Sequence, residues 1–403
     1  MSSPPRTPVR PLPRPRTTDV EPLAVYVHWP FCARICPYCD FNVVRDRGHT
    51  DQQAVLAGAI LADLQGHRTL TGPRRLVSIY LGGGTPSLMP PAWAEAIVGM
   101  AQNLWPSDGA LEVTLEANPT DAEASRFAAF AHAGVNRLSL GLQAIDDQAL
   151  AFLGRNHTAK EGIRAAAVAR DAFPRLSLDL IYARPGQTRW AWAAELEAAT
   201  SLGAEHISPY QLTIEEGTAF GRAVRRGQWA PPDADAAAAM YETTQEVLTA
   251  RGYEAYEVSN HARGEAARST HNLAYWRGRD YVGVGPGAHG RLTLDGVRTA
   301  VRAAARPTDY LLAVRESDIG WAEREALSPR QAAEERLLMG LRTLEGVDLA
   351  ELAPLGLGGA HPKLAMLADA ELVRLEGGRL LATARGRLVL DRVTTELATA
   401  EPS

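Results

Sequence analysis

Three cysteines lie in one short segment, Cys32-Ala-Arg-Ile-Cys36-Pro-Tyr-Cys39, and the 403-residue sequence contains no other cysteine. The spacing of three and two intervening residues allows the backbone to curl, so that the three thiolates converge on one metal centre. Structural zinc normally takes four protein ligands, whereas an iron-sulfur cluster takes one thiolate per iron. Three cysteines would leave a 4Fe-4S cluster with one open iron position. A small molecule with an amine and a carboxylate, such as S-adenosylmethionine (SAM), would chelate that iron.

The residues of this segment, taken alone, also allow alternatives to a cluster. A disulfide is disfavoured because the number of cysteines is odd and no secretory signal is recognisable. Zinc completed by His28 or His49 is the main alternative, and three buried thiols without a ligand are a weaker one. The spacing favours the cluster over zinc and over thiols without a ligand, and further residues along the chain are needed to distinguish these alternatives.

The composition is that of an ordinary globular protein, with 46% hydrophobic residues, 22% charged residues and a formal net charge of -5. This charge argues against a general nucleic-acid binder, and no apolar run is long enough to span a membrane. Few, clustered cysteines fit a reducing compartment, so we expect a cytoplasmic protein. Residues 1–20 are rich in proline and arginine and predict a disordered tail. An organellar presequence is disfavoured because the prolines break the amphipathic helix such signals need.

Residues 21–260 alternate between strand-like and helix-like segments. Strands are expected at residues 23–28, 76–81, 112–116, 137–141, 176–182 and 204–212. Helices are expected at residues 53–64, 93–104, 122–133, 160–171 and 191–202. This alternation predicts an α/β protein with a parallel sheet, curled into a partial (β/α)6-type barrel.

Chemically informative residues fall at the carboxyl ends of these strands, where such folds place their chemistry. The cysteine segment follows the first strand and Gly82-Gly-Gly-Thr-Pro86 follows the second. Glu116 ends the third strand, Gln143 the fourth, and Asp179 lies on the fifth. The glycine-rich turn exposes backbone groups to a ligand's amine or carboxylate. Taken singly, each feature is also consistent with an ordinary tight turn or a strand-end cap.

Together the motifs resemble those of the radical SAM superfamily, in particular the group of the oxygen-independent coproporphyrinogen III oxidases. The resemblance covers nearly the whole chain after residue 22 and favours an iron-sulfur cluster over zinc. It is carried by Tyr26-Val-His-Trp-Pro-Phe-Cys32, the cysteine segment, Gly82-Gly-Gly-Thr-Pro86, Glu116-Ala-Asn-Pro119, Leu140-Gly-Leu-Gln143, Leu153-Gly-Arg155, Asp179-Leu-Ile-Tyr182 and Ile207-Ser-Pro-Tyr-Gln-Leu-Thr213.

The resemblance implies a role for each matching residue. Cys32, Cys36 and Cys39 would ligate three irons of a 4Fe-4S cluster, and SAM would chelate the fourth. Positions around a first SAM correspond to Tyr26, Tyr38, Gly83, Gly84, Thr85 and Glu116. Positions around a second SAM correspond to Gln143, Arg155 and Asp179. The segment Ala183-Arg-Pro-Gly-Gln187 departs from the Gly-Leu-Pro of relatives, which predicts an altered pocket floor.

Two further features indicate a subgroup. The oxidases carry another cysteine two residues after the third, where this chain has Phe41. The motif His271-Asn-Leu-Ala-Tyr-Trp276 is similar to that of the haem chaperones of the HemW type, in which it is associated with haem binding. The resemblance therefore implies haem contacts by His271, Asn272, Tyr275 and Trp276. A neutral imidazole is a good iron ligand, although without the family His271 would be interpreted as structural.

The implied function is a haem chaperone that delivers haem to apo-haemoproteins such as respiratory enzymes, which can be membrane-associated. The first alternative is a coproporphyrinogen III oxidase, against which Phe41 and the His271 motif argue. The second alternative is a zinc-dependent binding protein without enzymatic activity. No nucleic-acid partner is expected.

The last third of the chain is expected to contain a connection and a small domain. Residues 261–325 would connect the barrel to residues 326–403 and include a glycine-rich turn over 281–289. There His289 is expected to be a polar loop residue rather than a second haem or metal contact. Helices at 330–343 and 385–398, a second helical region and a Gly-Gly hairpin at 372–382 predict a winged-helix-like α+β domain. Its mixed charges favour a lid or a partner surface over DNA binding.

Overall fold

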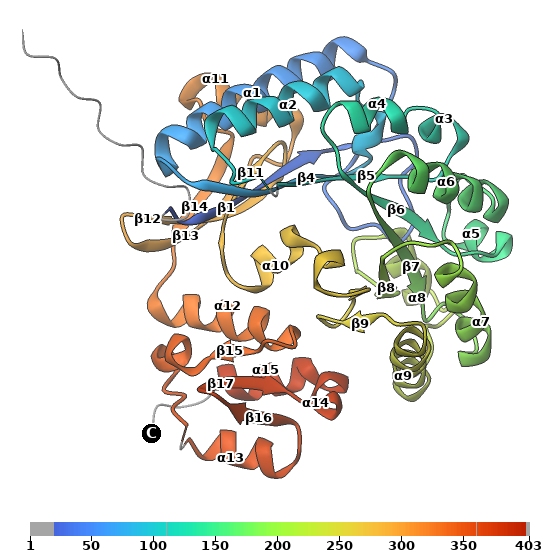
Figure 1. Ribbon diagram of the computed structural model, residues 1–403, viewed down its shortest axis with the longest axis vertical. Helices are drawn as coiled ribbons and strands as arrows, with labels where there is room; N and C mark the ends of the chain where they lie inside the picture. The colour runs from blue at the N-terminus through green and yellow to red at the C-terminus, as the bar shows by residue number, and fades with distance from the viewer. Residues whose placement is uncertain (1–19, 110, 360, 400–403) are drawn as a thin grey trace, which may run out of the picture.

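A computed structural model describes residues 20–109, 111–359 and 361–399 of the chain (Figure 1). The predicted disordered tail, residues 1–20, falls outside this part except for its last residue. The predicted alternation of strands and helices over residues 21–260 is present, and the α/β fold class is confirmed.

Six parallel strands form the centre of the sheet, in the order in which they occur in the chain. They are β1 (Pro22–Trp29), β4 (Arg75–Gly83), β5 (Glu112–Ala117), β6 (Arg137–Gln143), β7 (Arg175–Tyr182) and β8 (His206–Gln211). The connecting helices include α1 (Thr50–Thr71), α2 (Pro91–Leu104), α3 (Asp121–Ala124), α4 (Phe127–His132), α5 (Asp147–Phe152), α6 (Ala159–Ala172) and α7 (Arg189–Thr200). Figure 1 shows these helices on the outer side of the curved sheet.

The sheet continues on both sides of these six strands and has twelve strands among the described residues. Beyond β1 lie β11 (Asp280–Val284), β12 (His289–Leu294), β13 (Val297–Ala303) and β14 (Trp321–Ala326). Beyond β8 lie the two-residue strands β10 (His261–Ala262) and β9 (Glu254–Ala255). The prediction of a turn over residues 281–289 is therefore wrong for its first half, and also for its last residue, because His289 begins β12 and is not a loop residue. That half forms β11, because pairing with β1 satisfies its backbone hydrogen bonds.

Alternate residues of β1 face opposite sides of the sheet, as strand geometry requires. The odd-numbered side chains from Leu23 to Trp29 are fully buried in one core with α1 and α2. Tyr26 points to the inner side, where its ring lies 6.4 Å from that of His271. His271 belongs to α10 (Thr270–Trp276), which packs against the inner face of β4, β1 and β11. The first strands are thus covered on both faces.

The residues after β14 form a second unit with its own apolar core. Its elements are α12 (Pro329–Arg342), β15 (Val347–Asp348), the 3-10 helix η4 (Leu349–Leu355), α13 (Pro362–Asp369), β16 (Val373–Glu376), β17 (Arg379–Ala382), α14 (Ala384–Leu388) and α15 (Leu390–Ala398). Their order is the predicted one, and Gly377 and Gly378, both at positive φ, form the hairpin turn. The final predicted helix is interrupted at Val389, whose φ of -126° and ψ of 31° are not helical.

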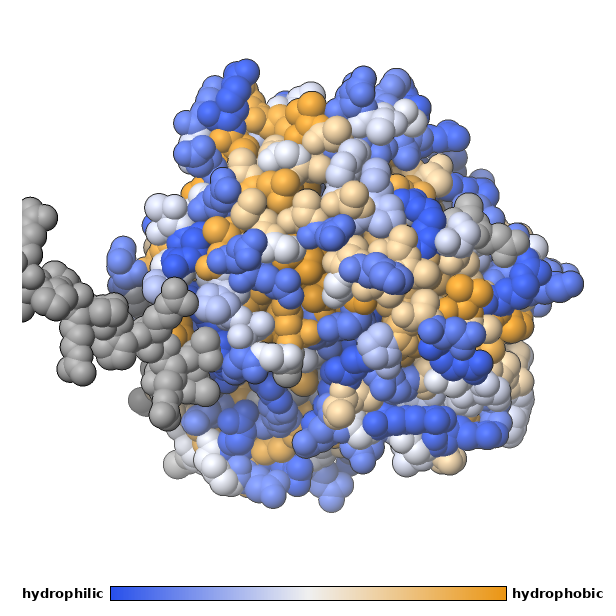
Figure 2. Space-filling view, turned by 45° about the horizontal axis from the view of Figure 1, so that its top comes forward, coloured by the Kyte–Doolittle hydropathy of each residue, from blue (hydrophilic) through white to orange (hydrophobic). Residues whose placement is uncertain are grey.

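No helix in the described ranges is both long and apolar enough to cross a bilayer. In Figure 2, hydrophilic and apolar residues are mixed over the face that carries the outer helices. The most exposed large apolar side chains are Trp190, Phe41 and Val55, at 71%, 62% and 59%. They lie far apart in the sequence, and Phe41 is two residues beyond the last cysteine of the cysteine segment.

Candidate functional site

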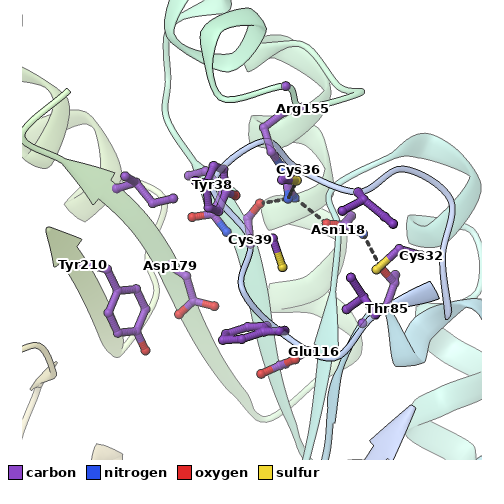
Figure 3. A pocket seen from close by; sticks show the side chains of 18 of the residues that line it. Cys32, Cys36, Tyr38, Cys39, Thr85, Glu116, Asn118, Arg155, Asp179 and Tyr210 are labelled. Atoms are coloured by element: carbon purple, nitrogen blue, oxygen red, sulfur yellow. Dashed lines mark hydrogen bonds between the residues drawn. The ribbon is translucent and has the colours of Figure 1, made fainter. Parts of the chain in front are cut away.

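A cavity of about 520 Å³ lies at the carboxyl ends of the parallel strands and is lined by all three cysteines (Figure 3). Its volume is within the range of small-molecule sites, roughly 300–1,000 Å³. Of the residues predicted for SAM, it is lined by Tyr38, Gly83, Gly84, Thr85, Glu116, Gln143, Arg155 and Asp179. We call this cavity the cluster cavity. The structure does not bring Tyr26 to it.

A chain of hydrogen bonds connects two of the cysteines along the cavity wall. Thr85 Oγ1 donates to Cys32 Sγ at 3.6 Å, and Asn118 Nδ2 donates to Thr85 Oγ1 at 3.1 Å. The guanidinium of Arg155 donates to Asn118 Oδ1 and, at 3.4 Å, to Cys36 Sγ (Figure 3). The guanidinium of Arg155 thus lies directly beside one of the three predicted cluster ligands.

Asn118 and Tyr210 are absent from the residues predicted for this site, although both line the cavity. Asn118 lies two residues beyond Glu116, and Tyr210 lies near the carboxyl end of β8. Their position at strand ends is the signal that points to both of them.

Glu116 is fixed from two sides. Tyr80 Oη donates to its Oε1 at 2.8 Å, and the Gly83 N-H donates to its Oε2 at 3.0 Å. Gly83 has a φ of 109°, and a Cβ there would lie 2.6 Å from the His28 ring, so this turn requires glycine. Burial raises the pKa of Glu116 to about 7, against the lowering effect of the hydrogen bond from Tyr80. The side chain is thus poised between its neutral and charged forms near neutral pH.

Two buried oxygen atoms at the cluster cavity have no hydrogen-bond partner among the described residues. Asp179 accepts from Ser139 Oγ at 2.9 Å through Oδ2, while its Oδ1 is unpaired. Burial raises the pKa of Asp179 to about 6. Gln143 Oε1 is also unpaired, and Gln143 has a φ of 64°, a conformation that non-glycine residues rarely adopt. Since buried polar atoms normally have partners, these two fit a ligand that donates hydrogen bonds.

The donor set fits a cluster better than a zinc ion. No three His, Cys, Asp or Glu side chains in the described part of the chain are placed to hold a single metal ion. Zinc draws its thiolates to about 2.3 Å from itself, whereas a 4Fe-4S cluster spreads them by placing one on each iron. His28 is not free as a fourth zinc ligand, because its ring nitrogens lie 3.0 Å from Tyr26 Oη and 2.8 Å from the Asn42 carbonyl oxygen. His49 is exposed just before α1.

A second cavity, of about 690 Å³, adjoins the first, and we call it the inner cavity. The two share Asp40, Phe41, Tyr80, Gly83 and Glu116. Three of the residues predicted for haem, and the displaced Tyr26, line the inner cavity: Tyr26, His271, Asn272 and Tyr275. The fourth, Trp276, does not. Its ring lies 4.7 Å from the Arg342 guanidinium and faces the C-terminal unit.

His271 is buried and fully hydrogen-bonded. Its side chain is 1% exposed, with Nδ1 2.9 Å from Ser78 Oγ and Nε2 2.8 Å from Tyr275 Oη. The ring stacks on Tyr80, with 4.8 Å between centroids. Burial lowers the pKa of His271 to about 3, so the imidazole is neutral at physiological pH. In this arrangement neither nitrogen is free for iron, and a haem contact by His271 stays a prediction.

Arg184 does not alter the pocket floor, contrary to the interpretation of residues 183–187. Its guanidinium forms a buried ion pair with Glu195 of α7, in which one guanidinium nitrogen donates a hydrogen bond to Glu195 Oε1 at 3.3 Å. The same carboxylate accepts from Gln187 Nε2 at 3.2 Å. Arg184 therefore ties the loop after β7 to α7, because the loop places it beneath the helix rather than in the cavity.

Comparison with known proteins places this geometry in a family. The radical SAM superfamily matches residues 26–199, and the HemN C-terminal domain matches residues 327–389. "Radical S-adenosyl methionine domain-containing protein 1, mitochondrial" of Bos taurus is 40% identical over 389 residues, which are 93% of this chain and 87% of that protein. "Heme chaperone HemW" of Mycobacterium tuberculosis is 36% identical over 384 residues, which are 94% and 95% of the two chains.

Among solved structures, the coproporphyrinogen III oxidase HemN of Escherichia coli superposes with a TM-score of 0.78 at 22% identity. The match covers 94% of this chain and 91% of HemN, and it confirms the predicted fold of a radical SAM barrel with a C-terminal domain. The family implies a 4Fe-4S cluster and SAM, and the residues around the cluster cavity fit both. With these similarities over nearly its whole length, the chain belongs to the radical SAM superfamily.

Proposed function

We propose that the protein is a haem chaperone, which binds haem in the inner cavity and delivers it to apo-haemoproteins such as respiratory enzymes. The observation that carries this proposal is the placement of His271, Asn272 and Tyr275 on a cavity that adjoins the three cysteines. Relatives named heme chaperone HemW, at 36% identity in Mycobacterium tuberculosis and 39% in Escherichia coli, support it.

The two cavities would bind different groups, the cluster cavity the iron-sulfur cluster with SAM and the inner cavity the haem. Cys32, Cys36 and Cys39 would hold the cluster, and Glu116 and Asp179 would accept hydrogen bonds from SAM. The bound cluster and SAM together supply one-electron chemistry, for which the protein provides orientation and exclusion of water. Further from the cysteines, the aromatic side of the inner cavity would hold the haem.

Phe41 argues for the chaperone over the oxidase. It lines both cavities, and its ring is 62% exposed at their junction. A phenyl ring has no thiol for cluster or radical chemistry, but it offers a flat apolar surface to a macrocycle. The position that distinguishes the two groups in sequence thus lies where the two cavities adjoin.

The C-terminal unit, for which residues 326–403 remain the proposed boundaries, is a suitable partner surface or lid. Arg336 of α12 donates to the Trp276 carbonyl oxygen at 3.0 Å, and Arg342 covers the Trp276 ring. A recipient protein that binds this unit would therefore bind to a part of the chain that contacts α10, the helix of the His271 motif. The cytoplasm remains the proposed location.

The proposed function is tested by titrating haem into the anaerobically reconstituted protein beside a coproporphyrinogen turnover assay with SAM and a reductant. We expect saturable haem binding with a shifted Soret band and no loss of coproporphyrinogen. The variant His271→Ala tests the motif, because a haem contact predicts weaker binding. Turnover of coproporphyrinogen without haem binding would favour the oxidase instead.

SAM is expected to bind more tightly at pH 8 than at pH 6. The carboxyl groups of Glu116 and Asp179, with pKa values raised to about 7 and about 6, must lose their protons to act as charged acceptors. Affinity then rises with pH, by at most about tenfold per unit for each proton released, and levels off above both pKa values. Calorimetric titration of the protein with SAM between pH 5.5 and 8.5 measures this pH dependence of the affinity. Glu116→Gln should flatten the upper part of the curve, and a wild-type affinity that is constant over this range would contradict the assignment.

A further inference from the structure

A histidine and an arginine lie side by side on the wall of the inner cavity. His289 is the first residue of β12 and is directly opposite Arg302 of β13. Opposed residues of antiparallel strands have side chains on the same face, about 4.5–5.5 Å apart at Cβ. Both residues line the inner cavity, so β12 and β13 present an imidazole and a guanidinium to it.

Of the three histidines that line this cavity, only His289 has a free ring. The ring nitrogens of His28 and of His271 are all within hydrogen-bond distance of protein atoms. The His289 ring makes no hydrogen bond to the described residues, and the residue is exposed. Burial of part of the ring and the charges of Arg291 and Arg302 lower the pKa of His289. The imidazole is therefore neutral near pH 7, the form that coordinates iron.

The other walls of the inner cavity include aromatic rings that suit a flat macrocycle. The rings of Tyr275 and Tyr281 lie 4.3 Å apart, and Phe41 closes the side toward the cysteines. Arg302 is paired with Glu323 on β14, but both side chains are about half exposed, at 43% and 59%. An exposed pair of this kind contributes little stability, so Arg302 can exchange its partner for a carboxylate of a ligand.

Asn42, three residues after Cys39, fixes the chain that follows the cysteine segment to the hairpin of β12 and β13. Its Nδ2 donates at 2.8 Å to the carbonyl oxygens of both Pro286 and Ala305. These residues lie three positions before His289 and three positions after Arg302. Phe41 and His289 therefore face the same cavity from two segments that one side chain holds together.

We propose that His289 is an axial ligand of the haem iron and that Arg302 binds a haem propionate. This inference rests on the proposed function as a haem chaperone. His271, by contrast, is a positioning residue, which fixes α10 and the Tyr275 hydroxyl on the opposite wall. The iron would lie on the side of the cavity formed by β12, and the aromatic rings would flank the macrocycle.

The test is a haem titration of the full-length reconstituted protein and of the variants His289→Ala, His289→Met, Arg302→Met and His132→Ala. His289→Ala should lower the affinity for haem by more than the roughly 10–100-fold that is typical when a residue that only supports a metal ligand is lost. His289→Met should change the Soret band and the paramagnetic resonance of the ferric haem, because thioether replaces imidazole. His132 is an exposed histidine on α4 and serves as the matched control, with binding unchanged.

Arg302 is tested with two ligands. Arg302→Met should weaken binding of haem but not of haem dimethyl ester, which has no free propionates. Iron and SAM content equal to that of the wild type shows that each variant is folded. If His289→Ala binds haem with the wild-type affinity and spectrum, the ligand assignment is overturned while the chaperone function stands. If the wild-type protein binds no haem, the proposed function fails and this inference fails with it.

Discussion

The variant Cys36→Ser is expected to lose its iron-sulfur cluster, so that bound iron and sulfide fall from about four each per chain to near zero. Only three cysteines exist in the chain, and a cluster that already has one iron without a thiolate has no spare protein ligand. Serine has the size of cysteine but is a poor ligand for iron. The broad visible absorption of the anaerobically reconstituted protein should disappear together with the iron.

The matched control is Phe41→Ser, which introduces the same hydroxyl two residues after Cys39. Phe41 is exposed at the edge of the cluster cavity and is not a predicted ligand, so this variant should keep its full iron content. A colourless wild-type protein with one zinc ion per chain would contradict the assignment and favour the zinc alternative.

The variant Arg137→Met is expected to reduce the free energy of unfolding by about 3–5 kcal/mol, the cost of breaking a buried ion pair from one side. Arg137 is 1% exposed, and its Nε lies 3.0 Å from Glu112 Oε2. Its other nitrogens donate to Ser177 Oγ at 3.1 Å and to the Ala267 carbonyl oxygen at 2.9 Å. Methionine fills similar space but leaves the buried carboxylate without its closest cation. The midpoint of urea unfolding, followed by circular dichroism, measures the effect.

The same network holds the start of α10, which carries the residues proposed to contact haem. Glu112 Oε1 accepts from the His271 backbone N-H at 3.0 Å and, at 3.4 Å, from Ser269 Oγ. Loss of Arg137 is therefore expected to loosen the start of α10 as well as the sheet. The control is Arg251→Met, because the pair of Arg251 with Glu197 is about half exposed and should change stability by less than about 1 kcal/mol. Equal shifts for the two variants would refute the structural role of the buried pair.

The parallel strands could be predicted because each is a short apolar run between helical segments. The run at residues 176–182, for example, differs from β7 by one residue. The strand β11 could not be predicted in the same way. It contains Gly283, and its partner β1 lies more than 250 residues earlier in the chain, so that long-range pairing decides its conformation.

The cluster cavity was largely accessible to prediction because its residues occupy strand ends, and parallel strands place those ends at one edge. Trp276 illustrates a limit of motif matching. On an α-helix it lies five residues, or about 140°, away from His271, so that the two cannot share a face. The pairing of His289 with Arg302 depends on the register of a hairpin, which no local pattern in the sequence specifies.

The two edges of the twelve-stranded sheet affect how copies of the chain meet in a crowded solution. One edge, β9, has only two residues, and the other, β14, carries Glu323, Arg324 and Glu325 in succession on an exposed strand. Short or charged edge strands are poor templates for further strand pairing. The large open sheet therefore ends at both sides in segments that resist edge-to-edge aggregation, even though its curvature leaves it unclosed.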